Sequence, residues 1–160
     1  MKKAFVAALV FLSPGFAAAE WKVEEGAKVS NLRNARTGII AILPATEAVD
    51  GVTAYLQVEC FEHPKSTARI LNIVTSKDAA PGLMMWSYQF DDKPPKRRGP
   101  YSRLSSTVTG LGDSSSDEFK GLSKARRLRV TLMPTQGRRW SFEFDLSGAA
   151  EAINAVPCEK

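Results

Sequence analysis

Basic residues are the side chains whose number and spacing most clearly suggest a binding chemistry. Four of them share the proline-rich segment 91–100: Lys93, Lys96, Arg97 and Arg98. Ammonium and guanidinium groups bind anions through charge-assisted hydrogen bonds. We interpret the segment as an exposed loop whose cations could hold an anionic partner. The alternative is a solvated loop whose charge serves solubility alone.

Two further basic groups follow along the chain: Lys124, Arg126, Arg127 and Arg129, then Arg138 and Arg139. In a hairpin of strands 128–132 and 140–146, these two groups would lie at opposite ends of neighbouring strands. Lysine and arginine also protect sheet edges from pairing with other chains. The sequence leaves the binding and the protective interpretations open.

Candidate catalytic groups are few. The single histidine, His63, follows a predicted strand in a turn-like context, with no Gly-x-Ser-x-Gly or Ser-x-x-Lys motif elsewhere. Two cysteines and one histidine are too few ligands for a zinc site. Gly110-Leu111-Gly112 lacks the third glycine of a nucleotide-binding loop, so we expect a turn there and no cofactor. The carboxylate pairs that we consider for acid/base work are Glu59 with Glu62 and Asp91 with Asp92.

The first 19 residues have the pattern of an export signal. Met1-Lys2-Lys3 precedes the apolar run 4–12, and Ala17-Ala18-Ala19 provides an Ala-x-Ala cleavage site. We expect cleavage before Glu20 and release into the periplasm. The alternative, a retained anchor, is disfavoured because a span needs about 20 apolar residues. No later segment is apolar enough to span a membrane.

The expected mature chain, residues 20–160, has the size of a single domain. Loss of Lys2 and Lys3 leaves 20 basic and 17 acidic residues, a net charge of +3. That charge is too mild for a dedicated nucleic-acid-binding protein. We therefore expect no nucleic-acid partner.

The two cysteines, Cys60 and Cys158, predict a structural disulfide, because an even cysteine count in an exported chain usually forms bridges. The loop-entropy model assigns such a long closure about 4–5 kcal/mol. The alternatives are a redox pair, whose cysteines normally lie two residues apart, and a pair of metal ligands.

Alternation of apolar and polar residues predicts strands at 52–60, 84–90, 128–132 and 140–146, with weaker signals at 21–23, 37–43, 68–75 and 101–109. Ser115 and Glu118 have the spacing of a capping box that begins a short helix. Ala149, Ala152, Ile153 and Val156 form the apolar stripe of a C-terminal helix. Together these features predict an all-β fold, an antiparallel β-sandwich or open barrel of seven to eight strands with both helices and one disulfide.

Several short motifs, in this order, resemble a known family. They are Trp21-Lys22-Val23, Leu56-Gln57-Val58-Glu59-Cys60, Tyr88-Gln89-Phe90-Asp91-Asp92 and Phe142-Glu143-Phe144-Asp145-Leu146-Ser147-Gly148, followed by Ala152-Ile153 and Cys158. The chain resembles the small periplasmic proteins associated with bacterial type VI secretion, the VasI/TagO-like group. The resemblance covers most of residues 20–160. It implies a periplasmic accessory role and assigns no catalytic residue.

We therefore expect an exported, non-enzymatic binding or accessory protein that serves an envelope-spanning machine. Its partner would be an envelope protein or an anionic envelope component, such as a cell-wall polymer or a lipopolysaccharide phosphate. One alternative is a cell-wall hydrolase. Another is an inhibitor of such a hydrolase, which would insert the proline-rich loop carrying Arg97 into the enzyme. The oligomeric state stays open.

Overall fold

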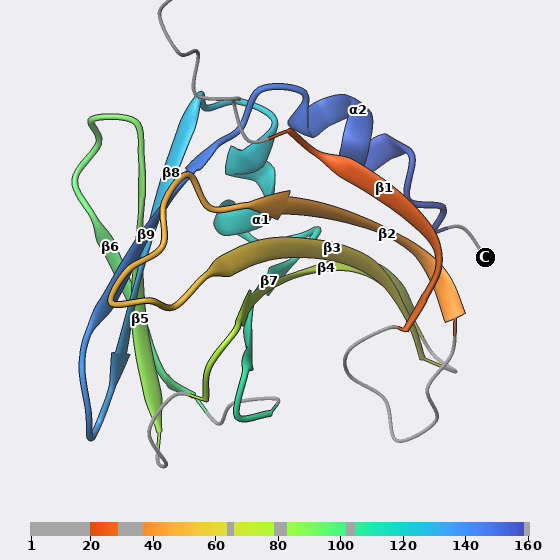
Figure 1. Ribbon diagram of the computed structural model, residues 1–160. Coiled ribbons are helices and arrows are strands. Elements are labelled where there is room, and N and C mark those ends of the chain that lie inside the picture. Colours follow the sequence, from red (N-terminus) through yellow and green to blue (C-terminus); the bar gives the residue numbers. More distant parts are fainter. Residues whose placement is uncertain (1–19, 29–36, 64–65, 79–82, 102–104, 159–160) are drawn as a thin grey trace, which may run out of the picture.

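Two antiparallel β-sheets make up the fold (Figure 1). The structure is a computed structural model that describes residues 20–28, 37–63, 66–78, 83–101 and 105–158. One sheet has the strand order β1-β2-β3-β4-β7 and the other has the order β6-β5-β8-β9. The predicted β-rich, antiparallel class is confirmed, and in the described residues the two sheets stay separate rather than closing into a barrel.

The five-stranded sheet contains β1 (Lys22–Lys28), β2 (Thr37–Pro44), β3 (Ala54–His63), β4 (Ser66–Thr75) and β7 (Val108–Asp113). The four-stranded sheet contains β5 (Met84–Phe90), β6 (Lys96–Tyr101), β8 (Arg127–Pro134) and β9 (Trp140–Asp145). The helices are α1 (Asp117–Leu122) and α2 (Ala149–Asn154). The expected signal peptide, residues 1–19, lies outside the described residues.

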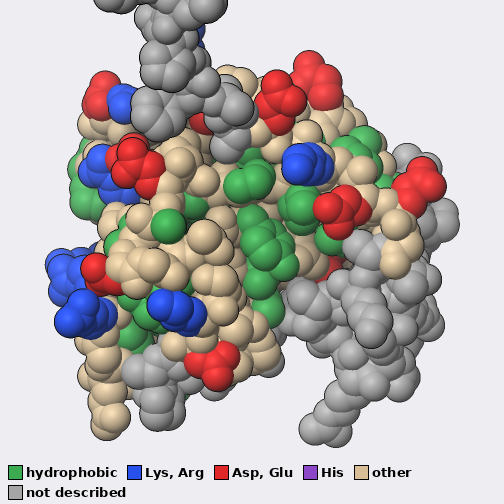
Figure 2. Space-filling view, viewed as in Figure 1, with side chains coloured by type: hydrophobic (Ala, Val, Ile, Leu, Met, Phe, Trp, Pro, Cys, Tyr) green, Lys and Arg blue, Asp and Glu red, His purple; other side chains and the backbone are tan. Residues whose placement is uncertain are grey.

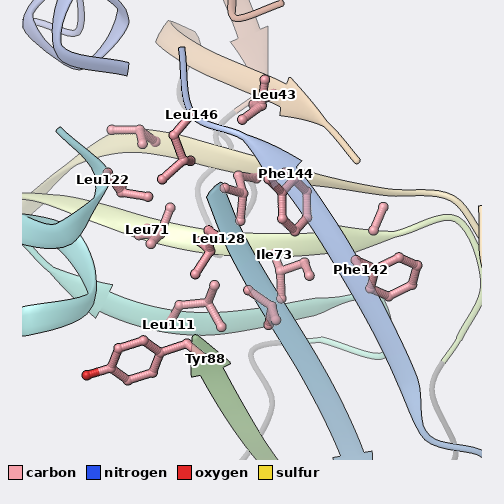
Figure 3. Close-up of a cluster of buried hydrophobic side chains, with 14 of the residues drawn as sticks. Leu43, Leu71, Ile73, Tyr88, Leu111, Leu122, Leu128, Phe142, Phe144 and Leu146 are labelled. Carbon is pink, nitrogen blue, oxygen red and sulfur yellow. The ribbon is translucent and has the colours of Figure 1, made fainter. Parts of the chain in front are cut away.

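The core lies between the sheets and follows the alternation of the sequence. In β8, Leu128 and Val130 are buried while Arg127 and Arg129 are exposed. Figure 3 shows leucine and isoleucine side chains of the five-stranded sheet facing Phe142 and Phe144 of β9. Each such side chain contributes about 1.5–3 kcal/mol when it leaves water completely. Burial of these faces therefore fixes the strand register.

Strand β6 differs from the prediction for its segment. The basic part of the proline-rich segment, expected to be a loop, is the edge strand of the four-stranded sheet and pairs with β5. Asp91 adopts a φ of 48° in the turn after β5, which lets the chain reverse. Proline is tolerated on an edge strand because it has no N–H to donate, and the outer side of such a strand has no neighbouring strand that would accept the bond. The lysine and arginine side chains of β6 therefore alternate between two sides of a sheet.

The weak strand signal at 101–109 was wrong in its extent, because Tyr101 ends β6 and Val108 begins β7. The expected turn at Gly110-Leu111-Gly112 is also part of β7, which pairs with β4 across a bulge. A Cβ at Gly112 would lie 2.4 Å from the Ser116 hydroxyl oxygen. The glycine thus permits the close approach of the strand to the helix that follows.

Helix α1 begins one residue later than the capping-box pattern predicted. Its N-cap is Ser116, whose hydroxyl accepts a hydrogen bond from the backbone N–H of Phe119 at 3.2 Å. Ser115 instead donates to the carboxylate of Asp113 through its backbone N–H at 2.8 Å. Phe119 and Leu122 are buried, as their spacing predicted.

The predicted disulfide is confirmed. Cys60 at β3 is bonded to Cys158, with 5.2 Å between their Cα atoms. Helix α2 precedes Cys158 and buries Ala152 and Ile153 against the core. Arg69 of β4 adds a hydrogen bond of 2.9 Å from its Nε to the carbonyl oxygen of Val156. The C-terminal segment is thus fixed to the five-stranded sheet.

Candidate functional site

A surface pocket with a volume of about 290 Å³ lies between the turn-and-strand segment after β5 and helix α1. Lys93 and Lys96 contribute to one wall, and Lys120 and Lys124 to the other. We call this site the lysine pocket. Two of its lysines belong to the predicted basic segment, and the other two come from the helix and the turn after it.

Aromatic side chains form the apolar part of the lysine pocket. Tyr88 and Phe90 alternate along β5 and therefore share a face. Their rings meet edge to face, with 5.6 Å between centroids. A Cβ at Gly121 would lie 2.2 Å from Cε2 of Phe90. Glycine at this position thus allows the backbone of α1 to pack directly on the ring.

The cations of the lysine pocket outnumber its carboxylates. Asp117 is the acidic residue among the described lining residues, and its Oδ2 lies 3.4 Å from Nζ of Lys96. Both side chains are more than half exposed, at 57% and 66%, so solvent screens the pair. The hydrogen bond from Lys96 to Asp117 raises the pKa of Lys96, and the charge interaction with Tyr88 raises it further. In the described part of the chain, Lys93, Lys120 and Lys124 form no ion pair.

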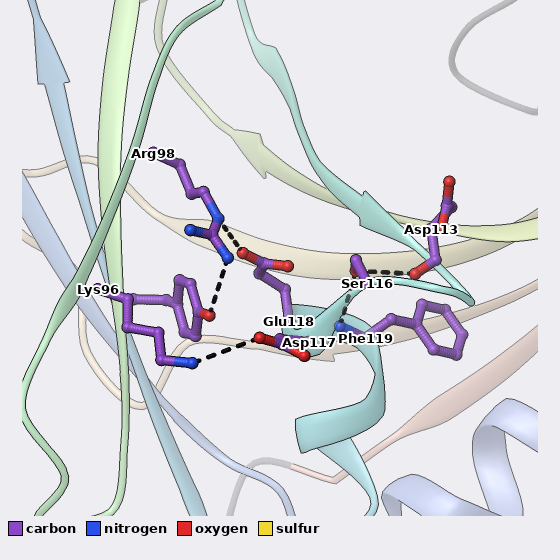
Figure 4. A network of polar contacts seen from close by, with 8 residues as sticks. Lys96, Arg98, Asp113, Ser116, Asp117, Glu118 and Phe119 are labelled. Atoms are coloured by element: carbon purple, nitrogen blue, oxygen red, sulfur yellow. Dashed lines mark hydrogen bonds and ion pairs between the residues drawn. The ribbon is translucent and has the colours of Figure 1, made fainter.

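Arg98 has a structural role beside the pocket. Its Nε forms an ion pair with Oε1 of Glu118, whose side chain is only 6% exposed (Figure 4). A second guanidinium nitrogen donates to the hydroxyl of Tyr88 at 3.4 Å. These contacts attach α1 to the edge strand β6. Arg98 therefore serves chiefly to position the helix wall of the lysine pocket.

Arg97 lies on the other face of the four-stranded sheet. It is exposed and pairs across the ladder with Ser87, whereas Lys96 pairs with Tyr88. The four basic residues predicted as one binding group are therefore divided. Lys93 and Lys96 line the pocket, Arg98 supports it, and Arg97 points away from it.

The hydroxyl of Tyr88 is held in its neutral form. Burial raises its pKa above the ordinary value, and the charge of Glu118 raises it further. The cations of Arg98 and Lys96 act in the opposite direction. Near neutral pH the group is therefore a hydrogen-bonding phenol rather than a phenolate nucleophile.

Replacing Glu118 with glutamine should destabilise the protein by about 1–3 kcal/mol, because a charge-assisted hydrogen bond is lost beside a partly buried guanidinium. Urea unfolding measures the change. Asp117→Asn is the matched control, since it removes a carboxylate from an exposed pair on the same helix and should cost less than about 0.5 kcal/mol. Equal effects of the two substitutions would contradict the role assigned to Glu118.

The carboxylate pair Asp91 and Asp92 is engaged in structural contacts. Oδ1 of Asp91 accepts hydrogen bonds from the backbone N–H groups of Arg126 and Arg127, each at 3.0 Å. Asp92 lies 3.4 Å from a guanidinium nitrogen of Arg127. The two side chains thus join the β5 turn to the start of β8, and they do not converge as an acid and a base.

Glu59 is fully buried on the face of β3 opposite Leu56 and Val58. Its two oxygens accept hydrogen bonds from the amides of Gln57 at 2.9 Å and Asn72 at 2.8 Å. Its proposed partner Glu62 and the single histidine His63 lie at the end of β3, and their side chains are outside the described residues. In the described part of the chain, no group of three potential ligands is placed to hold a metal ion.

Arg127 and Arg129 of the second basic group lie on β8 of the four-stranded sheet, and Figure 2 shows Lys and Arg side chains on that side of the molecule. Arg129 pairs with Glu143, with 2.8 Å from its Nε to Oε1, and Arg138 lies 3.7 Å from a carboxylate oxygen of Asp50. The antiparallel pairing of β8 with β9 places the two groups at opposite ends, as predicted. Only Lys124 of these residues lines the lysine pocket.

Lys120 was not predicted as a site residue, and Lys124 was predicted in a strand-associated group. Their spacing of four residues, on a short helix and the turn after it, is the signal that could have joined them. Tyr88 and Phe90 were predicted as strand residues without a role in a site. Their position beside the lysines depends on the docking of α1.

The fold and the pocket together define a class, a disulfide-linked β-sandwich with a basic, aromatic-floored surface pocket. No protein-family model matches the chain, and comparisons with curated proteins and with solved structures find no similar protein.

Proposed function

We propose that this protein is an exported, non-enzymatic binding protein of the periplasm whose lysine pocket holds an anionic group of an envelope partner. The observation that carries this proposal is the arrangement of four lysines around Tyr88 and Phe90, with one lining carboxylate. A concave site with aromatic lining and a few polar groups is typical of ligand binding. The excess of ammonium groups favours an anion.

The surroundings of the pocket favour binding over chemistry. The raised pKa of Tyr88 keeps the phenol protonated, and a general base needs an acceptor matched to the working pH. The predicted carboxylate pair Asp91 and Asp92 is held by backbone and guanidinium contacts. The side chains at the site therefore supply charge and an apolar surface.

Two features of the sequence support an exported location. The first 19 residues have the signal-peptide pattern, and a disulfide such as Cys60–Cys158 persists in oxidising compartments. Among the described residues, no helix is both long and apolar enough to cross a membrane. The resemblance to VasI/TagO-like proteins supports an accessory role at an envelope-spanning secretion system.

Two measurements test the proposal. Mass spectrometry of the protein from the periplasmic fraction should find an N-terminus at Glu20. Calorimetric titration with pyrophosphate should then show binding that weakens at least about tenfold when all four lysines of the pocket become glutamine, since several charge-assisted contacts disappear. The control is Arg138→Gln/Arg139→Gln, which removes two exposed cations elsewhere. Binding by the quadruple variant at wild-type strength would disprove the proposed pocket.

Replacing Asp117 with asparagine should strengthen pyrophosphate binding about two- to fivefold. The carboxylate of Asp117 is paired with the ammonium group of Lys96 and competes with the ligand for it, although solvent screens this exposed pair and keeps the gain small. Calorimetric titration at fixed ionic strength measures the change, with Asp50→Asn as the control because its partner Arg138 lies outside the pocket. Unchanged or weaker binding would contradict direct competition between Asp117 and the ligand.

A further inference from the structure

We propose that the group held in the lysine pocket is a phosphorylated saccharide unit. The inference rests on the proposed function above, since it specifies the anion that the same site recognises. It follows from three features of the pocket: the kind of cation on its walls, the number of those cations, and the shape of its floor.

The first feature is the kind of cation. Every basic residue that lines the pocket is a lysine, while Arg98 is committed to Glu118 and Arg97 lies on the opposite face of the sheet. The planar guanidinium group suits paired hydrogen bonds to a carboxylate or a phosphate, whereas an ammonium acts as a compact point charge with three donors and is a common phosphate ligand. A tetrahedral phosphate can accept from several such donors placed around it.

The second feature is the number of cations. Lys93 and Lys96 stand on one wall and Lys120 and Lys124 on the other, with the carboxylate of Asp117 as the opposing charge. A phosphate monoester carries a charge of about −1.5 to −2 at neutral pH and offers three strong acceptor oxygens. A carboxylate carries a single charge and two oxygens. The phosphate therefore matches the excess charge of the pocket better.

The third feature is the floor. Phe90 and Pro94 offer ring surfaces, and Gly121 covers one side of the Phe90 ring. The Tyr88 ring, in contrast, is buried beneath the cations of Lys96 and Arg98. The volume of about 290 Å³ is at the lower end of ligand sites, which span about 300–1,000 Å³. It has room for one sugar ring with its phosphate, whose C–H face would pack on the aromatic surface.

The polar groups on the floor suit hydroxyls. The carboxylate oxygens of Asp117 can accept hydrogen bonds from sugar hydroxyl groups, and the ammonium groups can donate to those hydroxyls. No asparagine or glutamine is among the described lining residues, so the amide side chains that often pair with the edge of a nucleobase are absent from that set. These features favour a saccharide as the carrier of the phosphate.

Calorimetric titration of the oxidised mature protein tests the inference with four probes: glucose 6-phosphate, glucuronate, inorganic phosphate and a short-chain phosphatidic acid. We expect glucose 6-phosphate to bind about tenfold more tightly than glucuronate, because the ring is the same and the charge differs. It should also bind about threefold or more tightly than inorganic phosphate, because the ring adds packing on the floor. Phe90→Leu should reduce that second ratio towards one, because the ring surface that the sugar packs on is lost.

The outcomes separate the inference from the proposed function. Equal affinity for glucuronate and glucose 6-phosphate would overturn the preference for phosphate and leave an anion pocket. Equal affinity for inorganic phosphate, or tighter binding of the phosphatidic acid, would overturn the saccharide. If none of these probes and no pyrophosphate binds, the proposed function fails as well. A Phe90→Leu variant that keeps the wild-type ratio would also overturn the role of the floor.

Discussion

Replacing both cysteines with alanine should lower the free energy of unfolding by about 4–5 kcal/mol, the range that the loop-entropy model gives for a closure of this length. Cys60 and Cys158 are separated by 98 residues, so the bridge restricts the unfolded chain strongly. In the folded protein it anchors helix α2, which buries Ala152 and Ile153. Losing the bridge should therefore affect that helix first.

Urea unfolding followed by circular dichroism measures the change. Wild-type protein unfolded in the presence of a reducing agent should match the Cys60→Ala/Cys158→Ala variant, because both lack the bridge. Amide hydrogen exchange should show the greatest loss of protection in residues 149–156. A loss of unfolding free energy below about 1 kcal/mol would contradict the stabilising role assigned to the Cys60–Cys158 bridge.

Reversing the charge of the helix wall should have the largest effect on binding. The variant Lys120→Glu/Lys124→Glu places two carboxylates beside the ligand instead of two ammonium groups, and we expect about 100-fold weaker binding of pyrophosphate. Both side chains are exposed, so stability should change by less than about 1 kcal/mol, including the lost interaction of Lys120 with the helix dipole. Calorimetric titration and urea unfolding together measure the two effects.

The control for charge reversal is Lys22→Glu/Lys77→Glu. These lysines are also exposed, and neither lines the pocket, so this variant changes the net charge equally without touching the site. We expect its affinity to fall less than about threefold at physiological ionic strength, where the Debye length is about 8 Å. An equal loss in both variants would attribute binding to the overall charge rather than to the lysine pocket.

The parts of the fold that the sequence predicted are those governed by local patterns. The alternation around Leu128 and Phe142 located β8 and β9, because each strand buries one face against the same core. The disulfide could be predicted because the chain has two cysteines and the expected exported location is oxidising. The stripe at Ala152 and Ile153 likewise predicted α2, which buries both residues.

The parts that were not predicted depend on contacts between distant segments. Pro95 and Pro100 indicated a loop, but pairing with β5 makes the segment an edge strand. The partner of Arg98 is Glu118, twenty residues away, so its structural role cannot be seen in a run of basic residues. The ion pair links α1 to β6 beside the lysine pocket. The pocket joins Lys93 and Lys96 with Lys124 of another basic group and with Lys120, which was not predicted.

Protection of lysines from an amine-reactive acetylating reagent tests the central claim most directly. The oxidised mature protein is labelled with and without saturating pyrophosphate, and each lysine is quantified by mass spectrometry. The lysine pocket predicts that the anion slows acetylation of Lys93, Lys96, Lys120 and Lys124, while Lys22 and Lys77 react at unchanged rates. Uniform protection of all these lysines, or protection of none, would contradict an anion-binding site between β6 and α1.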